Sequence, residues 1–255
     1  MFAIFKREFL SYFRNPSGYI AIALFSFLSG YIFINGFSTG AINLSSEISA
    51  LRSYFVIIVP IITMGLFAED KKRGTEVLYY TTPIDLFSVV AGKFLAALAL
   101  YGIMFINVFV HMIVTKACHG VVTVGTWGSV IVFFFLAALF ISIGIFASVI
   151  TDSQIISAIT SFIIILIIQL LSTISKLFGD AITAFLKMIG VNAESSSSVG
   201  DAIANAINWL DPFAKTSNFA YGIFSVAPLF FLICFATVFL FLSFRILEKK
   251  RWSQK

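Results

Sequence analysis

The chain has 255 residues, of which 60% are apolar and 11% are charged, and its formal net charge is +5. A soluble domain averages roughly 45–50% apolar and about 25% charged residues. The composition therefore excludes a soluble enzyme, a disordered chain and a disulfide scaffold. It predicts several membrane spans of about 20 mostly apolar residues each. In a membrane protein the positive charge is a guide to orientation, so we expect no nucleic-acid partner.

Residues 1–15 predict a short amphipathic helix. On a helical wheel aromatic side chains share one face, whereas Arg7 and Arg14 lie on the other. An aromatic face below and cations above suit a helix that lies in the lipid headgroup region. We expect this helix to end before Pro16, because proline disfavours helix at the residue that precedes it.

Six apolar runs follow and predict six transmembrane helices. They cover about 18–37, 53–68, 88–115, 126–150, 154–175 and 223–246. The second run is short and carries Pro60, so we expect a kinked helix whose ends extend into the flanking sequence. With the N-terminus inside, twelve of the 17 Lys and Arg residues fall in inner segments, Arg52 being one of the five outside. This asymmetry favours six spans with both termini in the cytoplasm.

The outer segment 176–222 is long enough to carry structure of its own. Its apolar-periodic pieces, about 177–189 and 202–210, are separated by Glu194 and four serines. A piece of about 13 residues is too short to cross roughly 30 Å of hydrocarbon at 1.5 Å per residue. We therefore predict two short helices in the outer interface, joined by a flexible polar loop.

Polar residues are rare within the predicted spans. For Asn107 and Gln169 an interhelical hydrogen bond is the simpler interpretation, and a place on a translocation path is the alternative. Lys93, near the start of its run, is expected to reach the cytoplasmic interface with its ammonium group. His111 has no neighbours with the spacing of metal ligands, so no metal site is predicted.

The sequence also lacks the motifs of an enzyme. It contains no GxxxxGK[ST] phosphate loop, and no Ser/His/Asp set or pair of carboxylates falls on common spans. We therefore expect no cofactor and no ATPase activity of its own. Paired acids for a proton relay are likewise missing from the predicted membrane core, which argues against a proton-driven transporter and leaves sodium coupling open.

The inner segment 69–87 carries the most specific pattern. It opens with Glu69, Asp70, Lys71, Lys72, Arg73, Gly74, Thr75, Glu76, Val77, Leu78, Tyr79 and Tyr80. A solvated loop anchored by its cations would explain the three bases, but it would not explain the apolar residues beside them. A short helix with a charged shoulder and an exposed apolar face is better suited to docking on a cytosolic protein.

This loop pattern resembles the type 2 family of ATP-binding cassette (ABC-2) transporter permeases. The matching elements are acid–acid–base–base–base–Gly-Thr-Glu-x-Leu, then Thr-x-Pro-Ile and Gly-Lys-Phe. The C-terminal run 241–252 resembles the ending of the gliding-motility and copper/nitrous-oxide-maturation branch. The resemblance covers essentially the whole chain. It implies an all-α, polytopic fold of the ABC-2 (type V exporter-like) kind, with residues 1–255 as a single transmembrane domain in a bacterial cytoplasmic membrane.

The resemblance also implies a division of labour. Family members pair two six-span permease subunits, identical or similar, and bind two separate ATPase subunits. The segment 69–87 would be the coupling loop that lodges in a groove of the ATPase, with Glu69 to Tyr80 in contact and Glu76 as its charged contact. The favoured function is the permease subunit of an exporter. The alternatives are a membrane anchor that transmits mechanical work without moving a substrate and, less favoured, an intramembrane enzyme.

Overall fold

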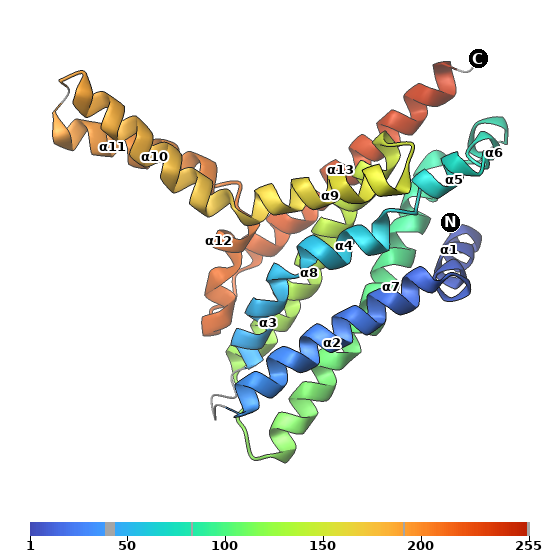
Figure 1. Ribbon diagram of the computed structural model, residues 1–255, viewed down its shortest axis with the longest axis horizontal. Helices are drawn as coiled ribbons and strands as arrows, with labels where there is room; N and C mark the ends of the chain where they lie inside the picture. The colour runs from blue at the N-terminus through green and yellow to red at the C-terminus, as the bar shows by residue number, and fades with distance from the viewer. Residues whose placement is uncertain (39–43, 83, 191, 254–255) are drawn as a thin grey trace.

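The computed structural model describes residues 1–38, 44–82, 84–190 and 192–253, and in these ranges it is helical with no strand (Figure 1). The elements in chain order are α1 (Phe2–Arg14), α2 (Pro16–Ser38), α3 (Leu44–Ser53), α4 (Phe55–Thr63), α5 (Ala68–Lys72), α6 (Val77–Thr81), α7 (Leu86–Ala117), α8 (Val124–Ile150), α9 (Gln154–Gln169), α10 (Leu171–Met188), α11 (Ala193–Asn208), α12 (Pro212–Thr216), the 3₁₀ helix η1 (Ser217–Tyr221) and α13 (Val226–Ser253).

Within the described ranges, four helices are long and apolar enough to cross a membrane, namely α2, α7, α8 and α13. Two bent pairs raise the number to as many as six. Helix α3 meets the stretch Phe55–Lys72 at 57°, and α9 meets α10 at 58°. The predicted all-α, polytopic membrane class is confirmed, with four to six candidate spans.

Helix α8 lies at the centre of the bundle and is more buried than the three other unbroken candidate spans of the described chain. Helices α3, α4, α7, α9 and α13 pack around it. Phe55 of α4 contacts Phe133 and Phe140 of α8, with ring centroids 4.9 and 5.3 Å apart. A Cβ atom at Gly144 of α8 would lie 2.2 Å from the Thr63 hydroxyl oxygen, so glycine is what lets α4 approach so closely. Such close packing of small residues drives helix association in lipid.

The second span is bent, as predicted, but the bend does not lie at Pro60. The helix breaks at Tyr54, between α3 and α4, and Pro60 lies inside α4. The predicted extension into the flanking sequence is confirmed, because α3 begins at Leu44. Backbone groups freed by a break within a membrane need partners. Gln169 supplies them, since its amide nitrogen donates to the carbonyl oxygens of Arg52 and Ser53, at 3.1 Å each.

The segment after α9 differs from the prediction. Helix α10 runs without interruption from Leu171 to Met188, and the serine run at 195–198 lies inside α11 instead of forming a loop. Helices α10 and α11 form a hairpin that projects from the rest of the molecule (Figure 1). A Cβ atom at Gly200 would lie 2.5 Å from the Gly179 carbonyl oxygen, so the two backbones nearly touch. This tertiary packing overrides the low helix propensity of serine.

Helix α1 ends where predicted. Asn15 has extended backbone angles, and α2 begins at Pro16. Helix α1 then folds back against α2 and α7. The Tyr12 hydroxyl donates to the Ile62 carbonyl oxygen at 2.8 Å, which ties α1 to α4. Its location in the lipid interface stays a prediction.

Candidate functional site

The predicted coupling loop folds into two short helices, α5 and α6, joined by a tight turn. Gly74 in this turn has a φ of +70°, a conformation that glycine adopts without strain. The Thr75 amide and hydroxyl both bond back to Asp70, at 2.9 Å to its carbonyl oxygen and 3.0 Å to its carboxylate. Figure 1 shows α5 and α6 at the same end of the molecule as α1 and both termini.

Asp70 joins this loop to the transmembrane bundle. One of its carboxylate oxygens accepts hydrogen bonds from the Tyr79 hydroxyl and from the Lys93 ammonium group, both at 2.6 Å. Tyr79 belongs to α6 and Lys93 to α7. A single carboxylate thus fixes α5, α6 and α7 relative to one another.

Lys93 is fully buried, and its ammonium group reaches the loop and α1 instead of solvent; its place at the cytoplasmic interface stays a prediction. It pairs with Asp70 and, at 3.1 Å, with Glu8 of α1, and it donates to the Leu66 carbonyl oxygen. Its ammonium group also lies 4.9 Å from the centroid of the Phe67 ring. A cation this enclosed needs such partners, because desolvation of an unpaired charge is costly.

Arg7 completes the set from α1. Its guanidinium pairs with Glu8 at 2.6 Å and donates to the Tyr79 hydroxyl at 2.9 Å. Burial, and then the Asp70 carboxylate, raise the pKa of Tyr79 against the lowering effect of Lys93. The phenol therefore stays neutral at physiological pH and can donate to Asp70. We call these five residues, Arg7, Glu8, Asp70, Tyr79 and Lys93, the charge network.

The other side of the loop faces outward. Val77 and Leu78 are 49% and 53% exposed, whereas Tyr79 is 4% exposed. The apolar face open to a partner therefore consists of Val77 and Leu78, and Tyr79 points into the charge network. The Glu76 carboxylate oxygen Oε2 is enclosed and has no hydrogen-bond partner among the described residues. The side chain of Tyr80 lies outside the described part of the structure.

The loop cations have separate roles. The Lys71 ammonium group donates to the carbonyl oxygens of Val149 and Thr151, at 2.6 Å each, which ties α5 to the turn between α8 and α9. Arg73 pairs with Glu69 within the loop, and its side chain is mostly exposed, as is Lys72. Lys71 is thus a structural contact, and the exposed loop cations are Lys72 and Arg73.

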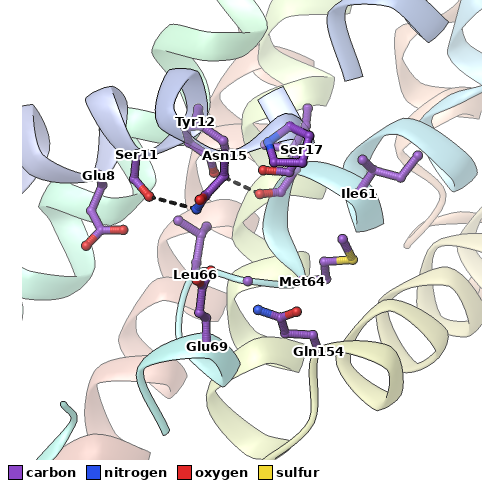
Figure 2. Close-up of a pocket in the computed structure, with 13 residues that line it drawn as sticks. Glu8, Ser11, Tyr12, Asn15, Ser17, Ile61, Met64, Leu66, Glu69 and Gln154 are labelled. Atoms are coloured by element: carbon purple, nitrogen blue, oxygen red, sulfur yellow. Dashed lines mark hydrogen bonds between the residues drawn. The ribbon is translucent and has the colours of Figure 1, made fainter. Parts of the chain in front are cut away.

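A cavity of about 190 Å³, lined by both polar and apolar side chains, lies beside the charge network, between α1, the end of α4, α5 and the start of α9. Figure 2 shows Glu8, Ser11 and Asn15 on the α1 side of it, together with Glu69 and Gln154. Glu8 therefore borders this cavity as well as pairing with Lys93. The charge network joins α1 to the α5–α6 loop, and the cavity is empty space between these two elements.

The two predicted path residues make interhelical hydrogen bonds. The Asn107 amide donates to the Ser26 hydroxyl at 2.7 Å, which joins α7 to α2. Gln169 joins α9 to the break between α3 and α4. The structure does not bring the two residues together at one site, and their place on a translocation path stays a prediction.

Sequence reasoning missed two buried charges in α3, because it treated the residues before 53 as an outer loop. The Glu47 carboxylate lies 2.6 Å from the Nδ1 atom of His111, and Arg52 is 7% exposed. The available signal was a helical spacing of apolar residues, Leu44, Ile48 and Leu51, around these charges.

The comparison with known families agrees with this architecture. The model of the ABC-2 family transporter protein matches residues 2–252, nearly the whole chain. No curated protein matches the chain. The specific branch within the family is therefore not established. The chain belongs to the ABC-2 transporter family, as a transmembrane permease component of an ABC transporter.

Proposed function

We propose that the chain is the permease subunit of an ABC exporter and that a separate ATPase subunit drives it by pushing on the α5–α6 loop. The observation that carries this proposal is the two-sided character of the loop. Its outer side presents the exposed side chains of Val77 and Leu78, and Glu76, whose Oε2 atom is enclosed without a hydrogen-bond partner among the described residues, directly precedes them. Its inner side is tied through the charge network to α1 and α7.

This geometry supports a route for mechanical force. A push on α6 reaches Tyr79, which contacts both Asp70 and Arg7. From Asp70 it passes to Lys93 and so to α7. Breaking an enclosed ion pair is costly, so the loop, α1 and α7 would move together. Lys93 acts here as a positioning residue, because its buried ammonium group contacts Asp70 and Glu8 of the chain itself.

The partner surface follows from the outer side of the loop. An apolar groove would receive Val77 and Leu78, and a cation of the ATPase would pair with Glu76. In line with the family, we propose two ATPase subunits and a second permease subunit, identical or similar. The assembly would lie in a bacterial cytoplasmic membrane, with both termini of the chain in the cytoplasm.

The test is Glu76→Lys in the assembled complex. Losing one partner of an enclosed charge pair typically costs about 2–5 kcal/mol, and the new lysine adds repulsion. We expect the ATPase to dissociate, or its turnover to uncouple, while the chain remains folded and inserted. Co-purification of the ATPase and ATP turnover measure this.

Glu194→Lys is the matched control, because it makes the same change at an exposed position on α11. A separate measurement tests whether the ATPase activity belongs to the partner: the purified chain without the ATPase should hydrolyse ATP at background rate. If Glu76→Lys keeps both the partner and full turnover, as Glu194→Lys should, the solvated-loop interpretation replaces the coupling one.

A membrane anchor that moves no substrate is the second candidate. The observation that favours it is that Asn107 and Gln169, the polar residues predicted for a path, are both engaged in interhelical hydrogen bonds. The same complex separates the two functions, since an anchor would couple ATP turnover to loop movement without any substrate altering the ATPase rate.

A further inference from the structure

A cavity lies at the end of helix α7, in a part of the chain that the proposed coupling does not use. Helix α7 runs from the end of the molecule that carries both termini to the opposite end (Figure 1), and Lys116 is the last residue but one of this helix. The cavity beside Lys116 has a volume of about 560 Å³ and lies between α7, the loop that follows it and Trp127 of α8. With both termini in the cytoplasm, as proposed, the cavity lies at the level of the outer leaflet.

The lining of this cavity suits a lipid chain. Apart from Lys116, the side chains that line it are apolar or aromatic, with Phe109, Met112 and Ile113 on α7 and Val121 in the loop. Ile113 is 69% exposed and Trp127 is 50% exposed, so the cavity is open to the outside of the bundle. Around a membrane-spanning helix this outside is lipid.

Lys116 adds one positive charge at the end of this apolar surface. Its side chain is exposed, and within the described part of the chain it forms no ion pair. Trp127 indicates the level of the bilayer surface, because tryptophan is enriched where membrane and water meet. An unpaired ammonium group at this level, beside an apolar cavity, is complementary to the phosphate and the acyl chain of a phospholipid.

A second cavity lies along the same face of α7. Four residues that line the two cavities follow one another at steps of seven residues, about two helical turns, and therefore share a face, namely Leu95, Gly102, Phe109 and Lys116. The second cavity has a volume of about 470 Å³ and is lined by apolar side chains. The distance along α7 from Leu95 to Lys116 is roughly 30 Å at 1.5 Å per residue, the thickness of the hydrocarbon core. This face therefore follows the bilayer from one leaflet to the other.

A second copy of the chain fits this face less well than a lipid does. Two copies with the same topology, related by a two-fold axis along the membrane normal, present the same residues at the same depth. Lys116 of one copy would lie at the depth of Lys116 of the other. Among the described residues no carboxylate lines either cavity, so neither copy offers a negative charge there. A lipid phosphate supplies that charge.

We propose that the cavity at the end of α7 binds an anionic phospholipid of the outer leaflet. Its phosphate pairs with the Lys116 ammonium group, Trp127 lies beside the start of the acyl chain, and the chain fills the apolar cavity. This site holds a lipid of the surrounding bilayer, and it is separate from the α5–α6 loop at the other end of α7.

The test measures quenching of Trp127 fluorescence by brominated lipids in nanodiscs that contain the full chain. Trp209→Phe and Trp252→Phe leave Trp127 as the single tryptophan. The two quenchers are phosphatidylglycerol and phosphatidylcholine with identical brominated chains, so they differ in headgroup charge alone. Each is diluted into unbrominated phosphatidylcholine. We expect half-maximal quenching at about a fivefold lower fraction of phosphatidylglycerol, the preference that one cation near the bilayer surface provides.

Variants at Lys116 test whether this cation causes the preference. Lys116→Gln should remove it, so that both lipids quench equally, whereas Lys116→Arg should keep it because the charge remains. Lys187→Gln is the matched control, since it removes an exposed cation from the α10–α11 hairpin, and it should keep the full preference. Lys116→Gln should melt at the wild-type temperature, because no ion pair of the chain is lost.

Four outcomes overturn the proposal. They are equal quenching of the wild-type cavity by the two lipids, a preference that survives Lys116→Gln, a preference that Lys116→Arg fails to keep, and the absence of quenching by either lipid, which would mean that protein covers this face. The measurement uses no ATPase. A failure here is therefore separate from a failure of the proposed coupling at Glu76.

Discussion

The α5–α6 loop and the α10–α11 hairpin are both helical connections between candidate spans, yet they are held in different ways. The loop is joined to α1 and α7 by ion pairs that meet at Asp70 and Lys93. The hairpin packs mainly on itself, through the close approach of Gly179 and Gly200, and projects away from the bundle (Figure 1). A connection built in the first way passes movement to the bundle, whereas one built in the second way moves as a unit of its own.

The largest effect should come from removing the shared cation of the loop. Lys93→Met leaves Asp70 and Glu8 without their enclosed partner. Breaking a buried ion pair costs about 3–5 kcal/mol, and we expect the lower end because both carboxylates keep other donors. The free energy of unfolding in detergent measures this loss, and ATP turnover of the complex should uncouple with it.

Lys187→Met on the hairpin is the control for this comparison, because Lys187 is exposed. We expect a change within about 0.5 kcal/mol. If Lys93→Met and Lys187→Met lowered the free energy of unfolding equally, the loop would be held no more firmly than the hairpin.

An intermediate effect should follow from adding a methyl group to the hairpin. A Cβ atom at Gly200 would lie 2.0 Å from the Thr183 hydroxyl oxygen, so Gly200→Ala overpacks the contact and should cost about 1–3 kcal/mol. The loss should be local. Hydrogen exchange should speed up in α10 and α11, while ATP turnover of the complex stays unchanged.

Gly102→Ala on α7 provides the matched substitution, since nothing lies within 4 Å of a Cβ atom there. We expect it to preserve stability or raise it slightly, because alanine is the better helix former. If Gly200→Ala changed the ATP turnover of the complex, the hairpin would not move independently of the bundle.

The comparison also shows what could be predicted from the sequence. The apolar stretches of the sequence predicted the positions of α2, α7, α8 and α13, because the length of an apolar stretch can be read from neighbouring residues alone. The Asn15-Pro16 boundary was also local and was predicted correctly. The serine run in α11 was misplaced, because its helical state depends on contact with α10, and that contact forms only in the folded chain.

The candidate site was predictable as a segment but not in its orientation. The loop residues were identified from their pattern, yet the burial of Lys93 depends on Asp70, 23 residues away, and on Glu8 in another helix. Tyr79 looked like a surface residue beside Val77 and Leu78, and its hydroxyl turns inward because Arg7 and Asp70 are there to bind it. Which charges pair is decided by elements that are distant in sequence, and periodicity carries no information on that.

The smallest effect, and the sharpest test of the network, should come from Tyr79→Phe. The ring stays and only the hydroxyl between Arg7 and Asp70 is lost, so we expect a destabilisation of about 1 kcal/mol. Tyr221→Phe is the control, because Tyr221 is 82% exposed, and it should be neutral.

The pH dependence of this variant follows from the sign of the pKa shift. Burial, followed by Asp70, raises the pKa of Tyr79 above its ordinary value of about 10. Its contribution to stability is therefore complete below pH of about 10 and is lost as the pH rises through the raised pKa of the folded chain. The stability difference between wild type and Tyr79→Phe should thus shrink in alkaline solution, which unfolding curves at about pH 8 and pH 11 would measure. A difference that stays constant across this range would show that the Tyr79 hydroxyl does not link Arg7 to Asp70, and the pairing of Glu8 with Lys93 would then be what connects α1 to the charge network.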